Sequence, residues 1–341
     1  MTNFILDRRF FIKTFLISFF TKFIKAESLN KKIIIAFGSC SNQRRDMPHW
    51  KTIHSKSPDY LILLGDNVYG DFTNSSAFNL SNAYKNLKKN RYYLDLSYKK
   101  HIIPIWDDHD YGKNDGDKNW KFKNISKKLF LNFFSVKSND IRWSRKGIYK
   151  SWIISKPNKI KIIALDTRTF KDEFKLNKKN NKKKYIEDNS LNKTILGKEQ
   201  WSWLKKEIKD KYKLVIILSS FQVISKSHGW EKWNNFPAER KRLLNLLSSI
   251  KQKVLILSGD RHVGGFYETK VNKKIIHEVT SSSFNQNVFF PHEPDSLRVG
   301  KLINENNYGL LEVDFQYGSL KIEVNSTINN KINFLFKVFK I

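Results

Sequence analysis

The sequence predicts a mixed α/β protein, specifically a four-layer α/β/β/α sandwich of two mixed β-sheets. Up to about residue 260, apolar β-rich runs alternate with segments of helical spacing, which indicates strands connected by helices. From residue 267 onward, short strand-like runs follow one another directly. Hydrophobic residues make up 40% of the 341 positions, enough for a large core. No repeat or linker is visible after residue 31, so residues 32–341 are expected to form one domain.

The first half of this domain is expected to alternate between buried strands and amphipathic helices. The run from Lys32 to Gly38 is apolar without interruption, as in a strand covered on both faces. A helix is expected over 47–56, because Trp50 and Ile53 fall on one of its faces. The other predicted elements are strands at 59–64 and 101–105 and helices at 77–90 and 118–134.

The second half begins with a predicted strand pair at 147–155 and 159–165. Residues 171–193 are rich in Lys and Asn and are expected to form an exposed loop. The remaining predicted elements are a helix that opens at 196–204, a strand at 213–219, a helix at 237–250 and a strand at 254–258.

The N-terminal segment has the features of a targeting sequence. Arg8 and Arg9, followed by Phe10 and Phe11, resemble the twin-arginine consensus of bacterial export signals. A short apolar run follows, with a plausible cleavage position after Ala26, so residues 1–26 are predicted to be an export signal. The alternative is an N-terminal anchoring helix. The signal predicts a periplasmic or otherwise exported protein that uses the twin-arginine translocation machinery, which carries folded proteins.

The chain is strongly basic. It has 63 Lys and Arg against 32 Asp and Glu, a formal charge of +31. Such a charge attracts nucleic acid, anionic lipid or anionic substrates. The lysines are scattered and no nucleic-acid-binding signature accompanies them, so a solvated cationic surface is the preferred interpretation. Nucleic acid is expected only as a substrate, and association with an anionic membrane surface is expected to be weak.

Polar side chains that bind metals follow several predicted strands. The densest cluster, residues 106–115, contains Asp107, Asp108, His109, Asp110 and Asn114. Close carboxylates are tolerated on a solvated loop or around a cation that neutralises them. Further strand ends carry similar groups, and these residues are Cys40, Asp66, Tyr69, Asp166, Gln222, Asp260 and His262. Ligand sites gather at the carboxyl ends of strands, and this mixture of sulfur, phenol, imidazole and carboxylate suits a transition metal next to a harder cation.

These strand-end motifs resemble those of the binuclear metallophosphoesterases, in particular the PhoD-like alkaline phosphatase branch. The motifs are GSC at 38–40, GDNVYGD at 65–71, WDDHDYGKND at 106–115, LDTR at 165–168, GKEQWSWL at 197–204, WEKWNNFPAER at 230–240 and SGDRH at 258–262. Each motif is weak alone, but their order and number cover nearly the whole chain from Ile33 onward. The export signal is typical of that branch too.

The resemblance implies a phosphate-ester hydrolase with an iron(III) and calcium centre. By position, Cys40 and Tyr69 would bind iron and Asp66 would bridge the two metals. Asp108 stands where the superfamily has a metal-binding Asn, and His109 stands near the leaving group. The resemblance also assigns metal ligation to the final motif and to one amide, namely Asp260, His262 and Asn114.

Each of several other residues has two possible roles. Arg168, Arg261 and Arg240 are candidate phosphate ligands, or members of ion pairs. Asp107, Asp110 and Asp166 are expected to support the ligands from behind, and the alternative for Asp166 is a purely structural role. The Trp201/Trp203 and Trp230/Trp233 pairs are expected to pack rather than to stack on substrate. His228 is expected either to be structural or to support the site from behind.

The expected activity is metal-dependent hydrolysis of phosphate monoesters, diesters or both, by an activated water or oxo group, with His109 assisting the leaving group and Asp108 holding the centre. Its role would be to supply phosphate outside the cytoplasm. Two alternatives remain open: a non-enzymatic cationic protein that binds anionic polymers, and a relative that has kept the fold but lost turnover.

Overall fold

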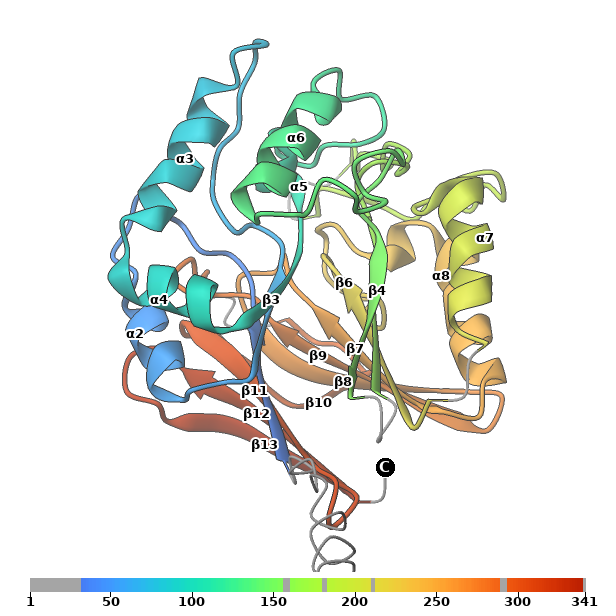
Figure 1. Ribbon diagram of the computed structural model, residues 1–341. Helices are drawn as coiled ribbons and strands as arrows, with labels where there is room; N and C mark the ends of the chain where they lie inside the picture. Colours follow the sequence, from blue (N-terminus) through green and yellow to red (C-terminus); the bar gives the residue numbers. More distant parts are fainter. Residues whose placement is uncertain (1–31, 156–159, 180–182, 210–211, 289–292, 340–341) are drawn as a thin grey trace, which may run out of the picture.

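In the computed structural model, two β-sheets pack face to face, with helices on both outer faces (Figure 1). The structure describes residues 32–155, 160–179, 183–209, 212–288 and 293–339. The predicted export signal at 1–26 therefore lies outside the described residues. Among the described residues, no helix combines the length and the apolar character needed to cross a bilayer.

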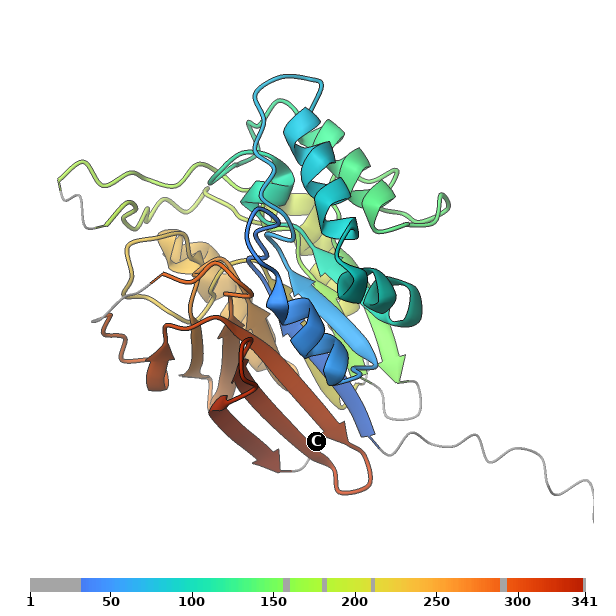
Figure 2. The same cartoon turned by 90° about the vertical axis from the view of Figure 1, so that its left-hand side faces the viewer.

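The first sheet has the strand order β13-β12-β11-β1-β2-β3. Three N-terminal strands run parallel to one another, and β1 is joined on its other edge to antiparallel C-terminal strands. Figure 2 shows these C-terminal strands, in red, beside the blue first strand. The bounds are β1 Lys32–Gly38, β2 Tyr60–Leu64, β3 His101–Ile105, β11 Asn307–Asp314, β12 Ser319–Ser326 and β13 Ile332–Phe339.

The second sheet has the order β10-β8-β9-β7-β6-β5-β4. Strands β5, β6, β7 and β9 are parallel, and β4, β8 and β10 run antiparallel to their neighbours. The bounds are β4 Lys150–Ser155, β5 Ile160–Ala164, β6 Leu214–Ser219, β7 Lys253–Ser258, β8 Gly264–Val271, β9 Lys274–Ser281 and β10 Arg298–Ile303.

Helices cover the outer face of each sheet. The first sheet is covered by α2 (Pro48–Ser55), α3 (Phe78–Lys88), α4 (Arg91–Lys99) and α6 (Lys123–Phe133). The second is covered by α7 (Gly197–Glu207) and α8 (Pro237–Ser249). The short helices α5 (Asp108–Tyr111) and η1 (Trp233–Asn235) lie in connecting segments. The predicted four-layer sandwich of two mixed sheets is therefore confirmed.

The apolar strands alternate between two cores. In β7, Leu255 and Leu257 point into the core between the sheets, whereas Val254 and Ile256 point toward the helices α7 and α8. Successive side chains of a strand point to opposite faces, so a strand covered on both faces must be apolar throughout. This explains the long apolar runs in the sequence and why most polar residues near the candidate site follow the strands.

The helix predicted over 77–90 ends early, at Lys88. A second, unpredicted helix, α4, follows it. The side chain of Asn90 accepts hydrogen bonds from the backbone N–H groups of Tyr92 and Tyr93, each at 3.1 Å. Asn90 is therefore the N-cap of α4 and not the last residue of the preceding helix.

The segment expected to be an exposed loop, 171–193, is only partly so. Phe174 and Tyr185 are 3% and 7% exposed and belong to the core beneath α7 and α8. Leu176 pairs with Tyr185 in an antiparallel bridge, and the N–H of Asp188 donates to the carbonyl of Asn235. The aromatic residues within the Lys/Asn-rich stretch thus fold it back onto the domain.

Candidate metal centre

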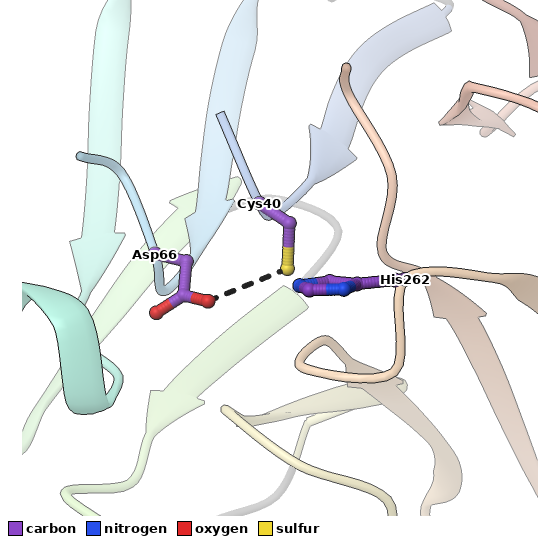
Figure 3. A group of neighbouring side chains, drawn as sticks. All are labelled: Cys40, Asp66 and His262. Carbon is purple, nitrogen blue, oxygen red and sulfur yellow. Dashed lines mark hydrogen bonds between the residues drawn. The ribbon is translucent and has the colours of Figure 1, made fainter. Parts of the chain in front are cut away.

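The segments that follow β1, β2, β3 and β7 converge at one end of the sandwich. They carry Cys40, Asp66, Asp108 and Asp260 respectively. The parallel register of β1, β2 and β3 places the carboxyl ends of these strands side by side. Figure 3 shows Cys40 and Asp66 from these segments together with His262, which follows β7, and their side chains point toward one another.

The backbone is strained at this end of the sandwich. Among the described residues, eleven non-glycine residues have a left-handed φ, and five of them lie here: Cys40, Asp66, Asp115, Asp260 and His262. Such backbone conformations are unfavourable for side-chain-bearing residues and cluster at functional sites, where the surrounding structure holds them in place. The turns after three strands are thus bent to aim side chains into one space.

Two glycines make these turns possible. A Cβ on Gly65, whose φ is +101°, would lie 2.4 Å from the Cβ of Asp107. A Cβ on Gly259 would lie 2.6 Å from the Ser39 hydroxyl and 2.9 Å from the carbonyls of Leu64 and Ser220. The glycine before each candidate ligand therefore lets neighbouring strand ends approach closely.

One side of the centre presents sulfur, imidazole and phenol. Ligand atoms of Cys40, Asp66 and His262 lie within 4.8 Å of one another. The Cys40 thiol is 3.6 Å from Oδ2 of Asp66, and the Tyr69 hydroxyl is 3.0 Å from Nε2 of His262. Burial raises the pKa of Cys40 to about 12. A thiol in this setting stays protonated unless a cation binds the thiolate.

The other side presents carboxylates. Ligand atoms of Asp107, Asp108 and Asp260 also lie within 4.8 Å of one another. Burial and the neighbouring carboxylates raise the pKa of Asp66 and of Asp260 well above the usual range. Oδ1 of Asp108 is buried without a hydrogen-bond partner, while its Oδ2 accepts from the N–H of Asp115 at 2.7 Å.

These observations fit a bound metal pair. Buried carboxylates with an unpartnered oxygen are costly, and a cation removes both the repulsion and the missing interaction. The donor set divides by chemistry: sulfur, imidazole and phenol suit a transition metal, and carboxylate oxygens suit a harder cation. Asp66 belongs to groups on both sides, so its carboxylate is placed to bridge them.

His109 is held beside the carboxylates. Its Nδ1 lies 2.5 Å from Oδ2 of Asp71, which leaves Nε2 available to another partner. Although burial lowers the pKa of His109, the charges of Asp108, Asp66 and Asp71 dominate and raise it to about 11. Cations that neutralise Asp66 and Asp108 would bring this pKa back toward neutrality.

A cavity of about 240 Å³ opens onto the centre. The candidate residues Asp66, Asp108, His109, Asp260 and His262 line it. Asn114 also lines it, as an exposed residue. Arg261 lines the same cavity and forms an ion pair with Glu293. The structure therefore brings every metal-ligand candidate of the sequence to this end of the sandwich, and it keeps Arg261 as a candidate for phosphate contact.

Arg168 is not placed to bind phosphate. Its side chain is 0% exposed, it does not line the cavity, and its guanidinium forms ion pairs with Asp107 and Glu231. Lys171, also buried, pairs with Glu231 at 3.0 Å. We name these four residues the buried ion cluster. The ion-pair alternative for Arg168 is therefore correct, because two carboxylates occupy the donors that a phosphate would need.

Three further predicted residues support the centre from behind. Asp110 accepts from the N–H and the amide of Asn67 and from the N–H of Asp107. Asp166 accepts from the Trp106 indole at 2.9 Å and from nearby N–H groups, so its structural alternative holds. Asp107 has a different position from the expected one, since it lies among the candidate ligands and also binds Arg168.

The tryptophans of the two pairs differ in exposure, and Trp230 stands apart. Trp201 and Trp233 are 1% and 0% exposed, as expected for packing. Trp230 is 42% exposed and lines the cavity, so the expectation that it packs is wrong. The imidazole of His228 is buried and accepts from the Trp230 N–H, in a structural role.

The residues of the site that sequence reasoning missed include Glu231, Asp71 and Lys184. Glu231 lies with Asp108 and Asp115 in a further group of possible metal ligands. Lys184 lines the cavity and forms an ion pair with Asp115. Asp71 could have been identified, because it closes the GDNVYGD motif, whereas Lys184 is one lysine among many.

Comparisons with known proteins agree with this geometry. A family model described as PhoD-like phosphatase matches residues 35–330. Alkaline phosphatase D of Bacillus subtilis is 29% identical over 109 residues, which cover 29% of this chain and 18% of that protein. The alignment thus spans less than a fifth of that curated relative.

Solved structures share the fold at low identity. A structure of PhoD superposes with a TM-score of 0.68 and 16% identity, covering 91% of this chain and 72% of that one. A purple acid phosphatase from yellow lupin seeds gives 0.59 and 10%, covering 91% and 54%. A Plasmodium protein described as the anchor in the inner membrane complex gives 0.61 and 11%, covering 91% and 89%. These matches show a common fold. The family model spans most of the chain and shows that this protein belongs to the PhoD-like phosphatase family.

Proposed function

We propose that this protein is a metal-dependent hydrolase of phosphate esters. The observation that carries the proposal is the set of strained strand ends that crowd buried carboxylates around one cavity, with Oδ1 of Asp108 unpartnered. Membership of the PhoD-like phosphatase family supports the same conclusion. The substrate is a phosphate ester, and a cavity of about 240 Å³ is large enough for the phosphate and part of its organic group.

We propose iron(III) and calcium as the two metals. Cys40, Tyr69 and His262 would hold the iron, because thiolate, phenolate and imidazole are donors that a transition metal prefers. Asp108, Asp260 and Asn114 would hold the calcium through oxygen, and Asp66 would bridge the two ions. When bound, the two ions supply Lewis-acid stabilisation of the phosphate and activation of the attacking water.

The residues of the chain supply positioning and proton transfer. Asp71 fixes the ring of His109 through Nδ1, so a proton on Nε2 faces the leaving oxygen of the ester. Arg261, on the cavity wall, is the cation proposed to contact a phosphate oxygen. The two roles are separable, because one acts on the leaving group and the other on the phosphate.

The cellular setting is also a proposal. The twin-arginine motif at the N-terminus supports export of the folded protein, with release of phosphate outside the cytoplasm. The charge of +31 supports recruitment of anionic substrates. It also supports weak association with an anionic membrane surface, without a spanning helix in the described part of the chain.

The fold alone does not guarantee turnover, since one structural relative is described as an anchor. The test is hydrolysis of 4-nitrophenyl phosphate and of its bis-ester by the full chain, with and without a chelator, beside measurement of bound iron and calcium. Chelator-sensitive turnover is expected, and the ratio of the two rates reports monoester or diester preference. Protein that contains both metals and hydrolyses neither ester would overturn the proposal.

A matched pair of variants separates the centre from the surface. Asp66→Asn is expected to lose bound metal and to lower kcat by about 100-fold or more. Asp95→Asn makes the same change on α4, where the carboxylate pairs with Lys99 at the surface, and should leave both quantities unchanged. Full metal content and activity in Asp66→Asn would show that Asp66 bridges nothing.

A further inference from the structure

Trp230 is unlike every other tryptophan of this chain. All nine tryptophans lie in the described residues, and Trp230 is the single one with an exposed side chain, at 42%. Trp50 and Trp106, for comparison, are 1% exposed. An indole carries a large apolar surface that folding normally buries, so one left open to solvent needs a reason.

The exposed indole lies at the candidate metal centre. Trp230 lines the same cavity as Asp66, Asp108 and His109. Val288, 38% exposed, lines it too, as does Lys184. The cavity thus has an acidic inner wall, which would hold metal and phosphate, and an outer wall with apolar surface.

The backbone that carries Trp230 is fixed. Its N–H donates to Nδ1 of His228 at 3.2 Å, and the carbonyl of Gly229 accepts from the N–H of Tyr185 at 2.9 Å. The next residue, Glu231, is anchored in the buried ion cluster by Arg168 at 2.7 Å. The ring is therefore presented by an ordered segment on both sides, and binding a ligand to it would require little ordering of the chain.

The size of the cavity places the organic group of a substrate near this ring. About 240 Å³ is below the range of sites that enclose a drug-sized ligand. A phosphate held by the inner wall would leave a large organic group to emerge past the outer wall. The side chain of Trp230 is 42% exposed and lines this cavity, so part of the indole is open to such a group.

We propose that Trp230 is the stacking surface of a subsite for the organic group, and that the protein prefers phosphate esters that carry a flat aromatic ring, such as nucleotides or aryl phosphates. This inference rests on the proposed function, because the phosphate must lie at the inner wall. Stacking of a base on an aromatic side chain contributes a factor of roughly 5 to 150 in binding.

The test compares two unreactive ligands that differ only in the ring. Phenylphosphonate and methylphosphonate share the anionic head group, and ester hydrolysis does not cleave their P–C bonds. Dissociation constants are measured by titration calorimetry on the metal-containing full chain. The wild type is expected to bind phenylphosphonate about tenfold more tightly than methylphosphonate. Trp230→Ala should reduce this ratio to about 2 or less, while Trp230→Phe should retain most of it.

A control variant removes another exposed aromatic. Tyr98, 81% exposed on α4, lies away from the cavity, so Tyr98→Ala should keep the wild-type ratio. An unchanged ratio in Trp230→Ala, or a wild type without preference, overturns the subsite. Ring preference without turnover of any ester would refute the proposed function and leave the subsite standing. Turnover without ring preference would refute the subsite and leave the proposed function standing.

Discussion

The buried ion cluster offers a demanding test of how the centre is supported. In Arg168→Leu, the guanidinium that joins Asp107 to Glu231 is replaced by an apolar group of smaller size. The cluster holds two cations and two carboxylates, so its formal charge is balanced. The substitution leaves two buried carboxylates facing Lys171 alone, and one negative charge has no counterpart.

The expected destabilisation is large because no solvent reaches these groups. The side chains of Arg168 and Glu231 are 0% and 2% exposed, with a 2.7 Å contact between them. Removing one partner of a buried ion pair costs about 3–5 kcal/mol, since the other charge stays buried and uncompensated. For a domain of this size, that corresponds to a fall in Tm of roughly 5–8 °C, because the entropy of unfolding is about 2.1 cal/mol/K per residue.

The assay is urea unfolding of wild type and variant, each with and without metal, followed by circular dichroism. Arg142→Leu is a matched control, since Arg142 forms a buried pair with Asp140, 3.0 Å away and outside the cavity. Asp140 keeps Lys150 as a partner, so this variant should be less destabilised and should retain its metal. Adding Glu231→Gln to Arg168→Leu should restore part of the lost stability, because it removes the surplus charge.

Two results would refute this reasoning. A destabilisation below about 1 kcal/mol would mean that the cluster is hydrated or rearranges at little cost. Unchanged stability together with weaker inhibition by inorganic phosphate would instead show that Arg168 binds phosphate.

Three further predictions concern charge and pH. In metal-free protein, Asp66→Asn should raise stability in urea unfolding by roughly 3 kcal/mol, the order of the repulsion between like charges that lie within 4.8 Å of each other at an effective dielectric near 20. A lower stability of the variant would contradict the crowding of the carboxylates. Burial lowers the pKa of His49 from 6.5 to about 3, so its contribution to stability is full above pH 6.5 and lost as pH falls from 6.5 to 3. At pH 5 the loss of stability is about 2 kcal/mol, so His49→Gln should flatten the pH dependence of Tm. An identical dependence of Tm on pH in wild type and variant would refute this role of His49. Lys274→Met should lower the free energy of unfolding by about 1–3 kcal/mol, because the Lys274 ammonium donates to the carbonyls of Leu247, Ile250 and Gln252 at the end of α8. Lys273→Met changes an exposed neighbour and should leave the thermal melting temperature unchanged.

Much of the fold and of the site could be predicted because both depend on local pattern. A strand covered on two faces must be apolar over its whole length, so β6 and β7 stand out from the sequence. Polar residues that follow such a strand, as Asp66 and Asp260 do, are restricted to its end. Parallel strand ends are adjacent in space, which brings these residues together without any knowledge of loop conformation.

The elements that were not predicted depend on distant contacts or on competition between local signals. Arg168 and Asp107 are 61 positions apart, and neither sequence context indicates the pairing. Asn90 is compatible with ending one helix or starting the next, and the cap hydrogen bonds decide it. The exposure of Trp230 has no compositional signature, because the same residue type three positions further on, Trp233, is buried.

The order of strands in the first sheet has a consequence for synthesis on the ribosome. Strand β1 ends at the segment that carries Cys40, and its second edge is completed only by β11, with Ile35 opposite Leu311. At about 5–20 residues per second, the nascent chain carries this apolar strand for roughly 14–55 s before its antiparallel neighbour is made. Until then one edge of β1 can pair with any other extended segment. Conditions that slow translation should therefore increase aggregation of the nascent chain more than they affect the finished protein.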